Sequence, residues 1–260
     1  MDQKNKTTSA RPVSPAVSQA AQLLLYLGSQ SGTDMTLTRI CEAVGIHKSK
    51  GYSILNALGE YGFVTRDENG KTYSLGPAVI PLGARAINDL DIHAAASAHL
   101  QALAEETACT VLLGMVSNDR FYVVGKYDGN AMVSLTIRQN QCFHITHGAH
   151  GKAIVAAMDD ETRKKILASP PLLFYGENTR VDRARLEAEF VRCRENGYAV
   201  DNESMTPGIR AVAAPVFDHR NTVFAGVVLA GMFGQDEIPA MGARVAAMGR
   251  WISRQAGASI

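Results

Sequence analysis

The stretch that decides the fold of the N-terminal part is TLTRICEAVGIHKSKGYSILNALGEYGFVTRDENGKTYSL, residues 36–75. Its apolar spacing predicts a helix that ends near Val44, a sharp turn at Gly45, and a second helix that ends near Gly62. Two short strands follow, joined by Asn69-Gly70, a strong hairpin-turn signal because both residue types tolerate positive φ. This order predicts a winged helix-turn-helix, whose second helix enters the major groove of DNA.

The start of the second predicted helix carries cationic and hydroxyl side chains, and basic residues occur on the preceding helix and on the wing. Lysines neutralise phosphates, whereas hydroxyl groups contact base edges or position the backbone. For any one of these side chains, a solvated surface position is an equally good interpretation. The candidate DNA-binding residues are Arg39, His47, Lys48, Ser49, Lys50, Tyr52, Ser53, Arg66 and Lys71.

The rest of the chain is predicted to be an α+β protein with two domains. Residues 1–13 are expected to form a disordered tail, and 14–76 the winged helix-turn-helix domain, beginning with a helix at Ser14-Pro15. Residues 77–91 are predicted as a linker helix and 92–260 as a second domain. Apolar runs in that domain predict strands over 109–116, 121–126, 132–137, 211–217 and 223–229, and a one-sided helix over 238–252.

Composition narrows the function classes. The 260 residues are 46% hydrophobic with a formal net charge of +1, so nucleic-acid binding must come from a local patch. The four cysteines form no C-x-x-C pair, which argues against a zinc ribbon or a disulfide framework. No run of about 18 apolar residues and no apolar signal region occurs, so we expect no membrane span and a cytoplasmic location.

Neither a cofactor nor an enzymatic activity is predicted. Gly151-Lys152-Ala153 lacks the spacing of a phosphate-binding loop and has alanine where a magnesium-binding hydroxyl belongs. The motifs G-x-S-x-G and H-E-x-x-H do not occur.

Four metal-capable side chains lie within nine residues: Cys142, His144, His147 and His150. Their spacing matches no common zinc module. If the segment is extended, 142 and 144 share one face while 147 and 150 follow a turn. Three interpretations stay open here: a metal site, imidazoles that line a pocket and hydrogen-bond an acidic or phenolic ligand, and simply packed or exposed histidines.

Three phrases in the second domain, together with the winged helix, resemble the IclR family of bacterial transcriptional regulators. They are Gly151-Lys152-Ala153, the stretch 196–201 (NGYAVD) and the stretch 208–218 (GIRAVAAPVFD). The resemblance implies a GAF-like domain for effector binding and oligomerisation, with an antiparallel sheet flanked by helices. It also implies binding to palindromic double-stranded operator DNA as a homodimer or a dimer of dimers, and no enzymatic activity.

By position, the family's pocket falls on Phe143, Ala149, His150, Asp201, Ala211, Val228 and Ala230. We expect His150, with His147 or Arg210, to hold a carboxylate or hydroxyl of the ligand. Members that bind small oxoacids place hydroxyl residues where Val228 and Ala230 stand. The less polar pocket favours a larger, partly aromatic ligand. Many members have arginine at the position of Ser53 and threonine at that of Lys50, so the operator sequence is not transferable.

The resulting hypothesis is a ligand-responsive transcriptional regulator, expected to repress a catabolic operon and to sense a small organic acid, aromatic rather than aliphatic. The alternative is a metal-sensing regulator that uses Cys142, His144, His147 and His150.

Overall fold

The structure, a computed structural model, describes residues 14–30, 35–67, 71–88, 91–130, 135–138, 141–176 and 180–260. The chain forms two compact units, Met1–Ala86 and Ile87–Ile260. The division lies within helix α4 (Val79–Asn88), inside the range predicted as a linker helix. The predicted tail 1–13 and the Asn69-Gly70 turn lie outside the described residues.

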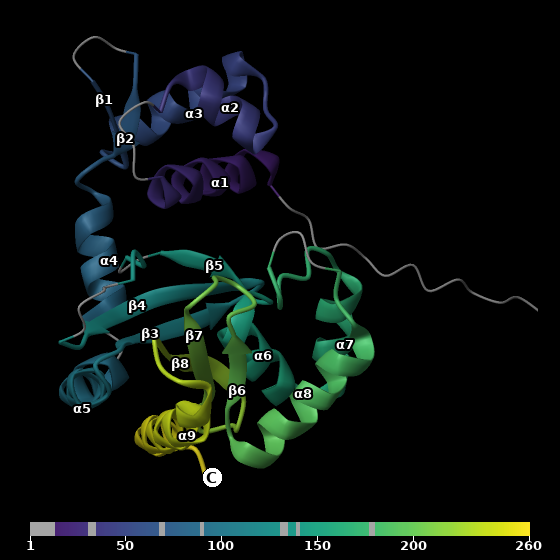
Figure 1. Cartoon of the computed structure of the whole chain (residues 1–260). Coiled ribbons are helices and arrows are strands. Elements are labelled where there is room, and N and C mark those ends of the chain that lie inside the picture. Colours follow the sequence, from purple (N-terminus) through teal and green to yellow (C-terminus); the bar gives the residue numbers. More distant parts are fainter. Residues whose placement is uncertain are drawn as a thin grey trace, which may run out of the picture. The chain divides into compact units, whose positions relative to one another are not determined.

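The first unit contains the predicted winged helix-turn-helix (Figure 1). Helices α1 (Pro15–Ser29), α2 (Leu37–Val44) and α3 (Lys48–Glu60) precede an antiparallel pair, β1 (Val64–Arg66) and β2 (Tyr73–Leu75). Thr36 caps α2 by accepting a hydrogen bond from the Arg39 backbone N–H at 3.4 Å. Gly45 ends α2 with a φ of 70°, a conformation that glycine adopts without strain. These local signals explain why the sequence alone specifies this unit.

Helices α2 and α3 approach closely at Gly51. A Cβ atom on this glycine would lie 2.2 Å from Cys41 Sγ, far inside van der Waals contact. Cys41 is buried, as are the core residues Ile40 and Leu55 of the same two helices. The absence of a side chain at position 51 therefore allows the packing of α2 against α3 that orients α3.

The second unit is built on a six-stranded antiparallel sheet with the order β5-β4-β3-β8-β7-β6. The element bounds along the chain are α5 (Asp91–Thr107), β3 (Thr110–Ser117), β4 (Arg120–Asp128), β5 (Cys142–His144), α6 (Gly148–Ala157), α7 (Asp160–Ala168), α8 (Arg183–Asn196), β6 (Ala199–Asn202), β7 (Arg210–Phe217), β8 (Val223–Gly231), the 3-10 helix η1 (Gln235–Glu237) and α9 (Ile238–Gln255).

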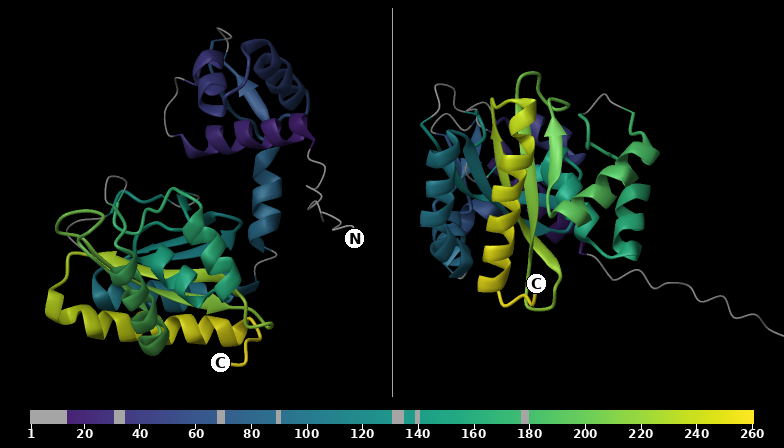
Figure 2. Two further views of the ribbon diagram at one scale, coloured as in Figure 1. Left: turned by 90° about the vertical axis from the view of Figure 1, so that its right-hand side faces the viewer. Right: turned by 60° about the horizontal axis from the view of Figure 1, so that its bottom comes forward.

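Helices cover both faces of this sheet (Figures 1 and 2). Helices α5 and α9 pack on one face, where Leu100 and Val245 meet Val227 of the sheet in one buried cluster. On the other face, Ile154 of α6 and Phe190 of α8 belong to a second cluster. This arrangement confirms the predicted α+β fold with an antiparallel sheet flanked by helices. None of the described helices is long and apolar enough to cross a membrane.

Two features of the sheet differ from the prediction. Residues 135–137, predicted as the end of a strand, have no regular structure, and 132–134 lie outside the described residues. The edge strands β5 and β6 were not predicted. Both are short, and each pairs with a neighbour on one side only, β5 with β4 and β6 with β7. Such strands lack the continuous apolar run that marks the doubly buried centre of a sheet.

Candidate functional sites

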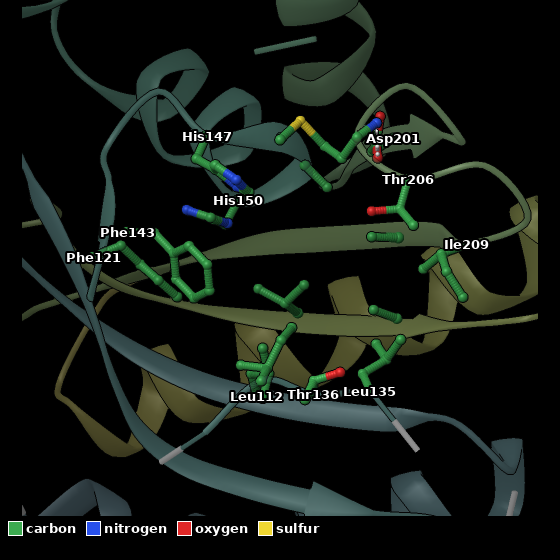
Figure 3. A pocket seen from close by; sticks show the side chains of 17 residues that line it. Leu112, Phe121, Leu135, Thr136, Phe143, His147, His150, Asp201, Thr206 and Ile209 are labelled. Carbon is green, nitrogen blue, oxygen red and sulfur yellow. Dashed lines mark hydrogen bonds between the residues drawn. The ribbon is translucent and has the colours of Figure 1, made fainter. Parts of the chain in front are cut away.

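A cavity of about 370 Å³ lies between the sheet and the N-terminal end of α6 (Figure 3). Its floor consists of small and aliphatic side chains from three adjacent strands: Leu112 of β3, Val228 and Ala230 of β8, and Ala211 of β7. The register explains this patch, because Val228 pairs with Leu112 and Ala230 pairs with Ala211. Alternate residues of a strand point to the same face, so these four side chains form one apolar surface.

One end of the cavity is aromatic. The rings of Phe121 and His150 stack with centroids 4.4 Å apart and planes inclined by 23°. His147 lies 5.5 Å from His150 and 5.0 Å from Phe143, again between ring centroids. Gly114 makes room for this cluster, since a Cβ there would lie 2.1 Å from the Phe121 ring. Figure 3 shows these rings gathered at one end, with Asp201 and Thr206 at the other.

His150 is a buried, uncharged imidazole. Burial lowers its pKa from the usual 6.5 to about 3; the neighbouring His147 acts in the same direction, and the backbone of His144 opposes it. Within the described part of the chain, the Nε2 atom has no hydrogen-bond partner. A neutral imidazole presents one donor and one acceptor. The backbone of His144 bonds to this ring, and the Nε2 atom is itself buried.

Asp201 supplies the carboxylate of the cavity from β6. It is 3% exposed, and burial raises its pKa. Its Oδ1 accepts a hydrogen bond from the Ser204 backbone N–H at 3.2 Å, and its Oδ2 accepts one from Met205 at 3.3 Å. These bonds tie β6 to the loop before β7, whose Met205, Thr206 and Ile209 also line the cavity.

Helix α6 brings its N-terminal end to the cavity. His147 is its N-cap residue without a side-chain capping bond, and Gly148 follows with a φ of 53°. His147, Gly148, Ala149 and His150 all line the cavity. The backbone N–H groups of His147 and Gly148 donate to the carbonyls of His144 and Leu173, at 3.0 and 3.3 Å. The positive end of the helix dipole still favours negative charge here.

The Gly-Lys-Ala phrase has a structural role. The Lys152 side chain is buried, lies 2.7 Å from Glu189 Oε2 and donates a hydrogen bond to the Val200 carbonyl at 3.0 Å. A Cβ on Gly151 would lie 2.4 Å from the Thr146 backbone, so the glycine allows close packing of α6. These contacts fix α6 against α8 and β6 and leave Lys152 outside the cavity lining.

Arg210 is placed differently from the expectation. Its guanidinium forms an ion pair with Glu203 and donates hydrogen bonds to Asn202 Oδ1 at 2.8 Å and to the Phe233 carbonyl. It does not line the cavity, because these partners hold it at the edge of β7. The other expected effector residues do: Phe143, His147, Ala149, His150, Asp201, Ala211, Val228 and Ala230.

The cysteine–histidine cluster does not converge. The His144 Nδ1 lies 2.8 Å from Thr146 Oγ1, and the Cys142 Sγ faces the Phe143 carbonyl at 3.8 Å. His147 and His150 instead take part in the aromatic end of the cavity. In the part of the chain that the structure describes, no group of three or more potential ligands is arranged to hold a metal ion. The geometry therefore supports the pocket interpretation for His147 and His150 and gives no support to the metal-sensing alternative.

The candidate DNA-binding residues lie exposed on the first unit. His47 is the N-cap residue of α3, and Lys48, Ser49, Lys50, Tyr52 and Ser53 follow on its first two turns. Arg39 on α2 and Lys71 before β2 are also exposed. The Ser53 hydroxyl donates to the Ser49 carbonyl of its own helix at 3.1 Å.

The wing and the recognition helix share a cation–π contact. The Arg66 guanidinium carbon lies 5.9 Å from the centre of the Tyr52 ring on α3 and 5.4 Å from that of Tyr73 on β2. The Asp67 side chain accepts hydrogen bonds from the backbone N–H groups of Lys71 and Thr72. Arg66 thus positions Tyr52 against the wing.

Sequence reasoning missed several residues that line the cavity: Leu112, Phe121, Leu135, Thr136, Ile137, Gly148, Met205, Thr206 and Ile209. The sequence offered a signal for Phe121 as a lining residue, because Phe121 follows the turn after a predicted strand and its side chain faces the same side as the apolar floor. The loop residues carried none, since a loop shows no periodicity from which the direction of a side chain follows.

Residues 84–254 match the profile of the "Bacterial transcriptional regulator IclR C-terminal" family, and residues 16–68 match that of the "IclR helix-turn-helix domain". The chain belongs to the IclR family of transcriptional regulators. KipR of Bacillus subtilis (strain 168), named an HTH-type transcriptional regulator, is 28% identical over 260 residues, which cover 99% of each chain. Rv1719 of Mycobacterium tuberculosis (strain ATCC 25618 / H37Rv), also named an HTH-type transcriptional regulator, is 32% identical over 200 residues, 76% of this chain and 75% of the relative.

Solved structures of IclR-family regulators share the fold. The crystal structure of the regulator from Alicyclobacillus acidocaldarius has a TM-score of 0.82 and 30% identity, covering 95% of this chain and 100% of that one. The winged helix and the cavity-bearing unit therefore correspond to the DNA-binding and effector domains of an IclR-family regulator.

Proposed function

We propose that this IclR-family regulator represses a catabolic operon and responds to a small aromatic organic acid that binds in the cavity of the second unit. It binds a palindromic operator as a homodimer or a dimer of dimers, and it catalyses no reaction. The observation that carries the ligand class is the lining of the cavity: an apolar floor with an aromatic end, where Phe121, Phe143, His147 and His150 gather.

The shape and chemistry of the cavity support this ligand class. A volume of about 370 Å³ suits a single-ring compound better than a two-carbon oxoacid. Val228 and Ala230 offer no hydroxyl to a small polar ligand, but they present a flat apolar surface to a ring. The positive end of α6 favours an anionic group at the rim.

The exposed face of α3 supports operator binding. Lys48 and Lys50 carry positive charge at the start of the helix, where major-groove readers place their contacts. The phosphate contacts of such residues set affinity, while hydroxyl groups at Ser49 or Tyr52 contact base edges.

For a ligand to control DNA binding, the protein must have two conformations that differ in their affinity for DNA, and the ligand must bind one of them more tightly than the other. A coupling free energy of about 1–3 kcal/mol gives a useful response.

Two measurements on the purified full-length protein test the proposal. Selection from a random duplex library followed by mobility-shift titration should yield a palindromic site. A thermal-shift screen of aromatic acids, phenols and aliphatic oxoacids should then find stabilisation by an aromatic acid, about 2.7 kcal/mol at a hundredfold excess over Kd. The aromatic ligand should release the selected DNA. An IclR homolog from Microbacterium hydrocarbonoxydans was solved in complex with 4-hydroxybenzoate; at 16% identity this likeness concerns the fold alone, but it makes that compound a practical probe.

Each part of the proposed function has its own contradicting result. Stabilisation by oxoacids alone would contradict the aromatic ligand class. A ligand that binds without changing the mobility-shift titration would contradict ligand control, and tighter DNA binding with ligand would contradict release from a repressed operator.

A further inference from the structure

The exposed side of α3 carries a stripe of polar side chains that extends beyond the start of the helix. The helix buries Gly51 and Leu55 in the first unit, so the residues opposite them face outward. Residues three and four positions apart are neighbours on a helix surface. At this spacing the exposed residues are Ser49, Tyr52, Ser53 and Asn56.

Asn56 carries the only side-chain amide of α3. An amide presents an acceptor oxygen and a donor nitrogen side by side, and adenine offers the complementary pair, N6–H and N7, in the major groove. A single hydroxyl makes only one such bond, and the Ser53 hydroxyl already donates to the Ser49 carbonyl at 3.1 Å. Homeodomains likewise read adenine with an asparagine in the middle of the recognition helix. Of the exposed stripe, Asn56 is therefore the side chain best suited to read a base.

The wing holds the neighbouring Tyr52 in place. The Arg66 guanidinium carbon lies 5.9 Å from the centre of the Tyr52 ring and 5.4 Å from that of Tyr73, both within the range of a cation–π contact. Tyr73 is only 5% exposed, so it anchors this stack in the core of the first unit, whereas the Tyr52 ring is 43% exposed. Arg66 therefore has a role within the protein that does not require DNA.

Tyr52 in turn lies beside the Asn56 amide. Hydrogen bonding to Asn56, and after it the charge of Arg66, lowers the pKa of Tyr52. A bond that favours the ionised phenol is one in which the amide N–H donates to the phenol oxygen. An amide nitrogen carries two hydrogens, so this contact leaves one N–H and the carbonyl oxygen of Asn56 for a base edge.

The surroundings of Asn56 leave its side chain accessible. It lines a hollow of about 400 Å³ between α3 and the wing, together with Thr65 and Arg66 of β1. Glu60, one turn further along the helix, lines the same hollow and is exposed. Its negative charge opposes the approach of phosphates, so Asn56 stands at the end of the stripe that DNA can approach.

We infer that Asn56 is a specificity-determining residue that reads an adenine in the major groove, and that Tyr52 and Arg66 are positioning residues that orient its amide. This inference rests on the proposed binding to a specific operator. It goes further because it assigns one base to one side chain outside the candidate residues, gives Arg66 a role other than phosphate contact, and leaves Ser49 as the hydroxyl that contacts a base edge.

The test measures base preference with the full-length protein. Starting from the duplex selected by the wild-type protein, each base pair of one half-site is replaced in turn and binding is followed by mobility-shift titration. At one A·T pair, replacement should weaken wild-type binding about 5- to 150-fold, the range of a bidentate contact to one base. At the same position 7-deazaadenine, which keeps base pairing and lacks the N7 acceptor, should also weaken binding.

Variants assign this preference to Asn56. Asn56→Ala should bind all base pairs at that position about equally, whereas Asn56→Asp only accepts hydrogen bonds and should prefer cytosine there. Glu60→Ala is the matched control: it lines the same hollow, changes affinity for every duplex by one factor, and should preserve the preference. Circular dichroism verifies the fold of each variant.

Two results separate this inference from the proposed function. If the wild-type protein selects a sequence and Asn56→Ala keeps every base preference, the inference is overturned and operator binding stands. If the wild-type protein selects no sequence, operator binding and the inference fail together.

The positioning roles have readouts of their own. Tyr52→Phe keeps the ring and its Arg66 contact but loses the hydroxyl, so it should reduce the adenine preference in wild type and leave base preferences unchanged in the Asn56→Ala background. A changed preference at another base pair would show that Tyr52 reads a base itself. Arg66→Gln should reduce the adenine preference without changing the slope of log K against log salt. A slope reduced by about 0.9 would make Arg66 a phosphate contact instead.

Discussion

Lys152 of α6 and Glu189 of α8 form a buried ion pair, with Nζ 2.7 Å from Oε2. The other Glu189 oxygen pairs with Arg185 at 3.0 Å. The centre of the Tyr175 ring lies 4.4 Å from Lys152 Nζ and 4.4 Å from Arg185 Cζ. This cluster fixes the helix whose first turn forms part of the cavity.

Breaking one half of this pair should destabilise the second unit strongly. Lys152→Met leaves the largely buried Glu189 carboxylate without its nearest cation, and we expect a loss of about 3–5 kcal/mol in chemical denaturation. The double variant Lys152→Met/Glu189→Leu removes both charges and should lose less than the sum of the single variants. Additive losses would show that the two charges do not interact. Lys165→Met, at an exposed lysine paired with Glu161, is the matched control and should cost less than about 1 kcal/mol.

The buried His150 should make the free energy of unfolding depend on pH. Burial lowers its pKa to about 3, so the folded state keeps the ring neutral while the unfolded chain takes up a proton below the ordinary pKa of 6.5. Stability should therefore fall as the pH falls from about 6.5 towards 3, by about 2 kcal/mol at pH 5.

Denaturation of His150→Phe across this pH range should show a shallower loss than wild type. His219→Gln, at an exposed histidine in the β7–β8 connection, should keep the wild-type slope. Glu189 adds a loss of the same sign in wild type and in His150→Phe. Burial alone would raise the pKa of this carboxyl, but Lys152 and Arg185 outweigh burial, so the pKa is lowered. The contribution of Glu189 to stability is therefore lost as the pH falls and the carboxylate becomes protonated. Identical slopes for wild type and His150→Phe would contradict a neutral buried ring.

The close approach at Gly51 should be essential for the winged helix. In Gly51→Ala the new methyl group would lie 2.2 Å from Cys41 Sγ, so α2 and α3 must separate or repack. We expect a loss of about 1–3 kcal/mol and weaker DNA binding, with ligand binding in the second unit retained. Adding Cys41→Ala removes the obstructing sulfur and should restore part of both properties. Failure of the double variant to improve on Gly51→Ala would argue for another cause.

The lysines at the start of α3 should contribute to the salt dependence of operator binding. If Lys48 and Lys50 each contact a phosphate, Lys48→Ala or Lys50→Ala should weaken binding to all sequences alike. Each should also reduce the slope of log K against log salt by about 0.9. Mobility-shift titrations at several salt concentrations measure this slope. Lys165→Ala should leave it unchanged, and an unchanged slope in both α3 variants would remove these lysines from the phosphate contacts.

The sequence predicts the first unit well because its signals are local. Thr36, Gly45 and the apolar spacing of α3 each act within a few residues. The direction of the Arg210 side chain is harder to predict, because a charged residue at the start of a strand has no periodic signal for its direction. Its partners Glu203 and Phe233 are set by tertiary structure. The Lys152–Glu189 pair likewise joins residues far apart in sequence. The positions of the cavity residues came from the family resemblance, because periodicity identifies a buried face but not a hollow in it.

At the floor of the cavity, backbone hydrogen bonds hold the sheet together, whereas side chains contact the ligand. Val228 and Ala230 lie on β8, which pairs through its backbone with β3 on one side and β7 on the other. Backbone pairing does not depend on which apolar side chain stands at these positions. Single substitutions of similar size at 228 and 230 should therefore alter the recognised molecule at a small cost in stability, and this strand is where related regulators can diverge to new signals.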